Sequence, residues 1–147
     1  MSLKEIYTEV IMEHNQSKHN KGPLEDAHES VRGHNPSCGD DLTVHLKVEN
    51  GIIEKVTYEG TGCAISEAST SIMIDLLTGE TLEVAHEKIK LFFDMIKDEV
   101  ADDIAEEALL DASILSNIKN MPARVKCAVL AWHALEQGMR NIEEAPK

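Results

Sequence analysis

Residues 42–58 read LTVHLKVENGIIEKVTY, and this stretch decides the fold. From Leu42 to Glu49 apolar and polar residues alternate, which is typical of a strand with one buried face. Asn50-Gly51 follows, and residues 52–58 then resume a strand-like pattern. An Asn-Gly pair between two such runs predicts a β-hairpin, because both turn residues must accept a positive φ.

Around this hairpin the chain is mostly helical. A weaker third strand is predicted near residues 30–33, and the apolar spacing of residues 3–14 predicts a helix that Ser2 can cap. Helices are also predicted over residues 64–77, from a Thr81 cap to about Lys97, in one or two short pieces after the acidic stretch 98–107, and from Pro122 to about Gly138. The order predicts one α+β domain over residues 1–147, with a small three-stranded antiparallel sheet packed against several helices.

Composition narrows the classes of function. The 147 residues suit one domain with a real core, and 42% of them are hydrophobic although only 3% are aromatic. A formal net charge of −13 disfavours nucleic acid and anionic membranes as partners. We see no signal segment and no apolar run of membrane-spanning length, so we expect a cytoplasmic protein. Three cysteines, far apart in sequence, argue against a disulfide framework.

The three cysteines lie in distinctive settings: NPSCGD at 35–40, EGTGC at 59–63 and PARVKC at 122–127. Cys38 lies in a loop bracketed by Pro and Gly, where it and Asp40 can project toward one side. Asp41 stands beside Asp40, and spacing alone does not choose between them. Cys63 follows a glycine pair where a strand meets a helix, so backbone N–H groups and the positive helix end favour its thiolate form.

Cys127 lies on the last predicted helix, whose apolar stripe includes Trp132 and Leu135. At about 100° per residue, Cys127 points roughly 130° away from the centre of that stripe. It is therefore not an obvious core residue. Arg124 is its near neighbour on the helix, and Lys126 flanks it in sequence.

Three sulfurs and one carboxylate make four ligands, which is the number in a closed tetrahedral zinc site, and thiolates suit iron–sulfur chemistry equally. Four negative charges exceed the charge of a divalent cation, and Arg124 is placed to offset part of the remainder. A closed site leaves no position for substrate, so chemistry requires that one ligand leave. Cys38 is the natural one, as a nucleophile that accepts sulfur from a persulfide.

At residues 35–40, 59–69 and 122–132 the chain resembles the U-type iron–sulfur cluster assembly family (IscU/NifU N-terminal-like), and in particular its SufU branch. The order and much of the spacing also match, so the resemblance spans roughly residues 5–138. Residues 15–22 depart from the Asn-Pro-Arg-Asn-like stretch that the family usually has after its first helix. Unlike the IscU branch, this chain has Lys126 where that branch has a histidine, and its longer segment between the second and third cysteines is placed at about residues 91–110.

The resemblance implies a SufE/NifU-like fold and zinc held by Cys38, Asp40, Cys63 and Cys127. It also implies that the protein takes sulfur from a SufS-type cysteine desulfurase, with Cys38 as acceptor and Arg124 near the contact surface, and serves downstream cluster assembly proteins. The alternative is a scaffold on which iron, or a transient 2Fe-2S cluster, occupies the same ligands.

Two other readings have less support. A zinc hydrolase or deaminase needs an open metal position and a neighbouring base, and the sequence has neither a His-x-Glu nor a Cys-x-x-Cys pair. A purely structural zinc module would not need its first cysteine in an exposed, glycine-containing loop. The seven histidines show no metal-ligand spacing among themselves.

Overall fold

The computed structural model describes residues 3–37 and 39–145 and is built around a three-stranded antiparallel sheet. The strands are β1 (Glu29–Asn35), β2 (Asp40–Glu49) and β3 (Ile52–Thr61), in the spatial order β1-β2-β3. Along β2 buried and half-buried residues alternate, as its sequence predicts. Asn50 and Gly51 have φ values of 54° and 75°, so the predicted hairpin turn is confirmed.

The helices are α1 (Leu3–Ser17), α2 (Ala64–Leu77), α3 (Leu82–Ile96), α4 (Asp102–Leu109), the 3₁₀ helix η1 (Leu110–Ile118) and α5 (Pro122–Glu144). The Thr81 cap is confirmed, because its side chain accepts a hydrogen bond from the backbone N–H of Val84 at 3.2 Å. The proposed Ser2 cap lies outside the described residues.

The predicted end of the last helix at Gly138 is wrong, since α5 continues to Glu144. Gly138 is buried inside the helix, where a Cβ would lie 3.4 Å from Val31 and 3.6 Å from Leu46. The glycine therefore sits where α5 approaches the sheet closely. Packing against the strands stabilises the helix through this position, and this overrides the weak local preference of glycine for a helix end.

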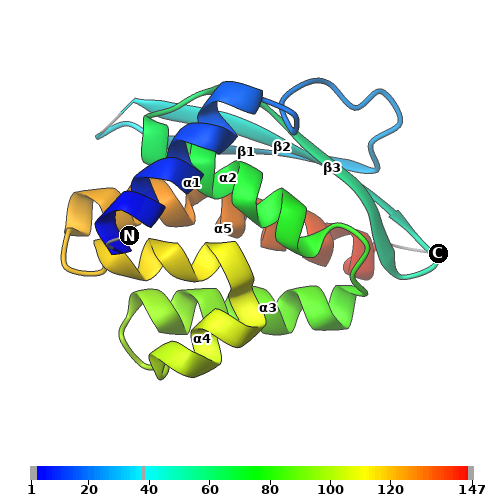
Figure 1. Cartoon of the computed structure of the whole chain (residues 1–147). Coiled ribbons are helices and arrows are strands. Elements are labelled where there is room, and N and C mark those ends of the chain that lie inside the picture. Colours follow the sequence, from blue (N-terminus) through cyan, green and yellow to red (C-terminus); the bar gives the residue numbers. More distant parts are fainter. Residues whose placement is uncertain (1–2, 38, 146–147) are drawn as a thin grey trace.

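The elements form layers, with the sheet on one side and helices stacked beneath it (Figure 1). Helix α5 packs on β1 and β2, α2 packs on β3 and α5, and α1 packs on α2. Helices α3 and α4, with η1, lie on the side of α2 and α5 that faces away from the sheet (Figure 1). None of the helices in the described part of the chain combines the length and apolar character needed to cross a membrane.

A buried contact between three helices fixes their relative positions. The indole of Trp132 on α5 stacks on Phe92 of α3, with ring centroids 3.8 Å apart. Its Nε1 donates to Ser69 Oγ on α2 at 2.9 Å, and Ser69 Oγ in turn donates to the carbonyl oxygen of Ala128 at 2.6 Å. Because every polar atom in this chain of contacts is paired, the first turns of α5 are held in register with α2.

Three distant segments meet at one end of the sheet: the start of β2, the junction between β3 and α2, and the beginning of α5. Gly60 allows β3 to reach this junction, because its φ is 108° and a Cβ there would overlap the carbonyl oxygen of Asp41 on the paired strand. A glycine is needed at this position. The strand therefore delivers Cys63 beside the first residues of β2.

Candidate metal centre

Asp40, Cys63 and Cys127 converge in space, with one ligand atom of each lying within 4.8 Å of the others. Asp40 is the first residue of β2, Cys63 immediately precedes α2, and Cys127 lies in the second turn of α5. The structure thus brings together three of the four residues that the sequence nominated. The fourth, Cys38, lies outside the described residues, between Ser37 and Gly39 in the connection from β1 to β2.

Asp40 belongs to this group and Asp41 does not. The Asp40 side chain is fully buried, and its Oδ1 accepts a hydrogen bond from the backbone N–H of Cys63 at 2.9 Å. Asp41 points to the other side of the strand, where Arg32 binds both of its carboxylate oxygens at 2.8 and 2.7 Å. The hydrogen bonds from Arg32 lower the pKa of Asp41. The pleat of β2 therefore separates two adjacent carboxylates that the sequence alone could not rank.

Cys63 is the N-cap residue of α2, as its setting predicted. Its backbone is extended, with φ −69° and ψ 169°, and its Sγ accepts a hydrogen bond from the backbone N–H of Ser66 at 3.4 Å. The Asp40 carboxylate lies at the same helix end. Unpaired N–H groups and the helix dipole place partial positive charge there, so this position suits a concentration of negative ligands.

Gly62 makes room for the carboxylate. A Cβ at this position would lie 3.1 Å from Asp40 Oδ1 and 3.0 Å from Ser66 Oγ, closer than ordinary contact allows. The sequence reasoning used Gly62 only to recognise a strand-to-helix junction. The structure adds a steric role, because any side chain at residue 62 would compete with Asp40 for its space.

Ser66 was not singled out from the sequence. It is 1% exposed, and within the described residues its hydroxyl oxygen has no hydrogen-bond partner. A buried hydroxyl normally has a hydrogen-bond partner. The unpaired Ser66 hydroxyl beside Asp40 and Cys63 therefore indicates that a bound group would supply its partner in the site. The signal available in the sequence was its position three residues after Cys63, where its backbone N–H donates to the capping Cys63 side chain.

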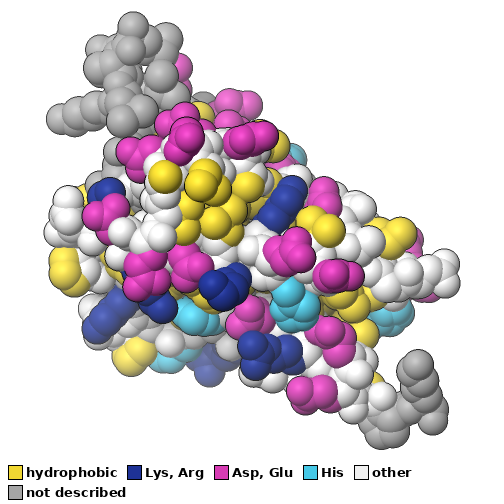
Figure 2. Space-filling view, turned by 90° about the horizontal axis from the view of Figure 1, so that it is seen from below, with side chains coloured by type: hydrophobic (Ala, Val, Ile, Leu, Met, Phe, Trp, Pro, Cys, Tyr) yellow, Lys and Arg dark blue, Asp and Glu magenta, His cyan; other side chains and the backbone are white. Residues whose placement is uncertain are grey.

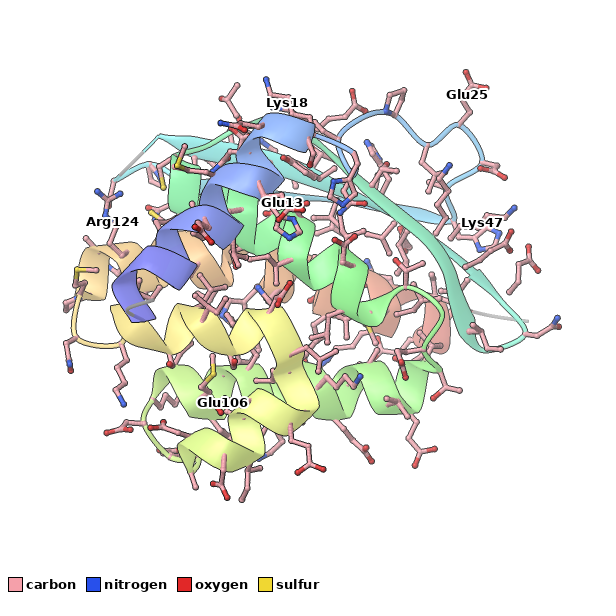
Figure 3. All side chains as sticks on the ribbon, in the orientation of Figure 1. Glu13, Lys18, Glu25, Lys47, Glu106 and Arg124 are labelled. Carbon is pink, nitrogen blue, oxygen red and sulfur yellow. The ribbon has the colours of Figure 1, made fainter. Side chains whose placement is uncertain are left out.

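Cys127 is 3% exposed and is buried with the core residues, although it is not part of the contiguous apolar cluster. The helical geometry predicted that its side chain points away from the stripe containing Trp132. In the structure that direction brings its sulfur close to Asp40 and Cys63. Arg124, one turn earlier, is exposed and does not join the group. Figure 3 shows its side chain at the end of the molecule where β1 and β2 connect. Lys126 is exposed as well.

The donors fit a borderline or soft divalent cation. Two cysteine sulfurs and one carboxylate oxygen are ligands typical of zinc and of iron–sulfur sites, whereas magnesium and calcium prefer all-oxygen sites. The unpaired Ser66 hydroxyl and the space kept by Gly62 both lie beside the same donors. The three described residues therefore provide most of a tetrahedral thiolate-rich site, and a fourth ligand would complete it.

The chain is similar in sequence to known proteins over nearly its whole length. The model of the NifU-like N terminal domain matches residues 6–147. The iron–sulfur cluster assembly scaffold protein IscU of Thermotoga maritima is 40% identical over 142 residues, covering 97% of this chain and 98% of that protein. The zinc-dependent sulfurtransferase SufU of Bacillus subtilis is 39% identical over 142 residues, covering 97% and 95%.

Solved structures agree with the sequence matches. A crystal structure from Fervidobacterium islandicum, described as an "iron-sulfur cluster assembly scaffold protein for SUF system", superposes with a TM-score of 0.84 at 38% identity. The superposition covers 92% of this chain and 97% of the chain in the crystal structure. The predicted α+β fold of the NifU-like type is thereby confirmed. The nearly equal identities to an IscU and a SufU protein do not separate the two branches.

Proposed function

The chain belongs to the family of NifU-like N-terminal domains, the U-type proteins of iron–sulfur cluster assembly, and we propose that it is a zinc-dependent acceptor of persulfide sulfur. Its donor would be a SufS-type cysteine desulfurase, and its sulfur would pass to later cluster assembly proteins in the cytoplasm. The observation that carries the proposal is the convergence of Asp40, Cys63 and Cys127 at the start of α2.

In this proposal Cys38, Asp40, Cys63 and Cys127 hold zinc. Cys38 is only two residues before Asp40 in the sequence, and this closeness in the chain supports a shared site. Bound zinc would keep the cysteine sulfurs as thiolates near neutral pH. The cation offsets two of the four ligand charges, and exposed Arg124 and Lys126 contribute positive charge beside Cys127.

The proposed step is a transfer of one sulfur atom. The Cys38 thiolate attacks the outer sulfur of the desulfurase persulfide, forming a new S–S bond on Cys38. The old S–S bond breaks, and its electron pair leaves with the desulfurase cysteine as a thiolate. A persulfide and a thiolate enter and a persulfide and a thiolate leave, so the step needs no external oxidant or reductant.

Arg124 is proposed to act at the contact with the desulfurase. It is exposed on the first turn of α5, at the end of the molecule where β1 and β2 connect (Figure 3). A guanidinium there can attract the negatively charged persulfide during encounter.

We place the branch-specific insertion at residues 91–110, a range that begins within α3 and ends at the start of η1.

The second candidate is a scaffold that assembles a 2Fe-2S cluster on the same ligands. The 40% identity to the IscU scaffold protein of Thermotoga maritima favours it. Two features favour the zinc-dependent acceptor instead: the lysine at position 126, immediately before the third cysteine, and the longer segment between the second and third cysteines. Anaerobic purification with metal analysis separates the two, because stoichiometric, tightly held zinc supports sulfur transfer whereas labile iron with sulfide supports the scaffold.

The direct test is a cysteine desulfurase assay with and without this protein, repeated with Cys38, Cys63 and Cys127 each replaced by serine. Sulfur acceptance should stimulate turnover, and each replacement should abolish the stimulation. Arg124→Ala should weaken the stimulation by a larger factor than it weakens zinc binding, with Arg140→Ala on the same helix as the matched control. Stimulation that survives all three cysteine replacements would overturn the proposal.

A further inference from the structure

A second group of metal-binding side chains lies between α1 and α2. His14, His19 and Asp75 each place a ligand atom within 4.8 Å of the others. Glu13 on α1 and Lys18, immediately after the end of α1, are labelled in Figure 3 and mark the segment that borders this group. Asp75 is three turns along α2 from Cys63, which is roughly 18 Å at 1.5 Å per residue. The group is therefore separate from the cysteine site.

His19 is fixed at both ring nitrogens. Its Nε2 lies 3.1 and 3.2 Å from the two carboxylate oxygens of Asp75. Its Nδ1 lies 2.6 Å from the hydroxyl of Ser17. The serine thus sets the orientation of the ring and directs Nε2 at the carboxylate.

His14 repeats this arrangement from inside the protein. Its ring is 7% exposed, and its Nδ1 lies 2.7 Å from the hydroxyl of Ser71 on α2. Its Nε2 faces the same Asp75 carboxylate at 3.9 Å, which is beyond hydrogen-bond distance. When Nδ1 carries the proton, the Nε2 lone pair and the carboxylate face each other, and a cation between them would satisfy both.

Asn20 completes the surroundings. Its amide nitrogen donates to the backbone carbonyl of Ser71 at 3.0 Å and to Asp75 Oδ1 at 2.9 Å. The same amide nitrogen lies 3.1 Å from His19 Nε2, so Asn20 contacts both the carboxylate and this ring, and a hydroxyl contacts Nδ1 of each imidazole. Outer hydrogen bonds of this kind hold ligands in place in natural metal sites and raise their affinity.

We propose that His14 Nε2, His19 Nε2 and the Asp75 carboxylate bind a divalent transition-metal ion of the zinc and cobalt class. Bonds of about 2.1 Å at tetrahedral angles place neighbouring ligand atoms roughly 3.4 Å apart. The distances from Asp75 to His19 and His14, 3.1 and 3.9 Å, bracket that value. Two imidazoles and one carboxylate suit zinc, cobalt or nickel, and they leave coordination positions for small molecules or water.

A cavity adjoins two of the three side chains. His14 and Asp75 line a cavity of about 200 Å³, together with Ile72, Leu76, Asp111 and residues of η1. Its walls are mostly apolar, and Asp111 supplies a second carboxylate. A small ligand could therefore reach the metal from solvent. The site has an open character that the four-ligand cysteine site lacks.

The same three side chains could also hold a proton in place of a metal, with a charged His19 paired to Asp75. Surface pairs of that kind are common, and His86 with Glu143 is another on this chain, at 2.6 Å. Within the described part of the chain that second pair contacts no further imidazole, so it provides a matched control. A pair held by a proton would bind no metal, and the two explanations can be separated by titration.

The test starts from the full chain loaded with one equivalent of zinc, which fills the cysteine site, and titrates it with cobalt by calorimetry. A second equivalent should bind, and paramagnetic broadening in proton NMR should reach the His14 and His19 rings first. His19→Ala and Asp75→Asn, both at exposed side chains, should each weaken the second binding event more than tenfold. His86→Ala should leave it unchanged.

Two outcomes would overturn the second site. One is that the zinc-loaded protein takes up no further cobalt, and the other is that His19→Ala and Asp75→Asn bind it as the unaltered chain does. The buried His14 is left intact in this design, and circular dichroism of each variant separates loss of folding from loss of binding. Repeating the titration with Cys63→Ser keeps the result independent of the proposed sulfur transfer, because that change should remove only the cysteine site.

Discussion

Replacing Gly62 with alanine tests whether zinc binding needs the space that this glycine leaves for Asp40. The new Cβ would lie 3.1 Å from Asp40 Oδ1 and 3.0 Å from Ser66 Oγ. Relief to an ordinary contact near 3.5 Å requires a movement of about 0.4 Å. Metal–ligand distances tolerate only about 0.2 Å, so a carboxylate that yields to the methyl group no longer fits the ion well.

The expected loss is ten- to a hundredfold in zinc affinity, equivalent to about 1.4–2.8 kcal/mol. Overpacking should lower the free energy of unfolding of the metal-free protein by about 1–3 kcal/mol. Zinc affinity is measured by competition with a chromophoric chelator, and stability by denaturant unfolding after metal removal. Gly138→Ala is the matched control, because a Cβ there meets Val31 at 3.4 Å in ordinary contact.

Gly138→Ala should leave zinc affinity unchanged and, as a substitution inside a helix, stabilise the fold by up to about 1 kcal/mol. The steric reasoning fails if Gly62→Ala binds zinc within threefold of the unaltered chain. It also fails if both alanine variants lose zinc to the same extent, because the effect would then come from general loosening rather than from displacement of Asp40.

Three further changes test neighbouring parts of the account. Cys63→Ser should weaken zinc binding at the cysteine site at least tenfold while the metal-free protein keeps its stability, because serine also caps a helix well; chelator competition and circular dichroism of the apoprotein check the two effects. Asp40→Asn should lower zinc affinity at least tenfold, whereas Asp41→Asn, which alters only an exposed ion pair, should leave it within threefold in the same chelator competition. Burial raises the pKa of Tyr58, so the folded state resists ionisation of its hydroxyl, and the free energy of unfolding falls as the pH rises above the pKa of about 10 in the unfolded chain. Tyr58→Phe should therefore lose less stability than the unaltered chain between pH 10 and 12 in urea titrations. An equal loss in both proteins would contradict this.

Local patterns predicted the parts of the fold that depend on neighbouring residues. The hairpin followed from Asn50-Gly51, and the start of α3 followed from Thr81, because turn and cap chemistry involves only a few adjacent positions. Gly138 was misread as a helix end because packing against β1 and β2 carries α5 past this position. Only the packed structure contains that information.

The candidate site was predictable from the types and settings of its residues but not in detail. Asp40 and Asp41 differ only in which face of β2 they occupy, and that face is set by tertiary packing at the start of α2. Sequence spacing could not predict the second group, which consists of His14, His19 and Asp75. His19 and Asp75 are 56 positions apart in the sequence and meet only when α1 packs on α2. Contacts between helices, rather than local sequence, create both features.

The central claim is that three cysteine sulfurs and the Asp40 carboxylate share one zinc ion. X-ray absorption at the zinc edge, on protein loaded with a single equivalent, measures this directly. The account predicts a shell of three sulfurs at about 2.3 Å and one oxygen at about 2.0–2.2 Å, with one sulfur lost in each cysteine-to-serine variant. A shell dominated by nitrogen or oxygen, or one that is unchanged by those replacements, would contradict it.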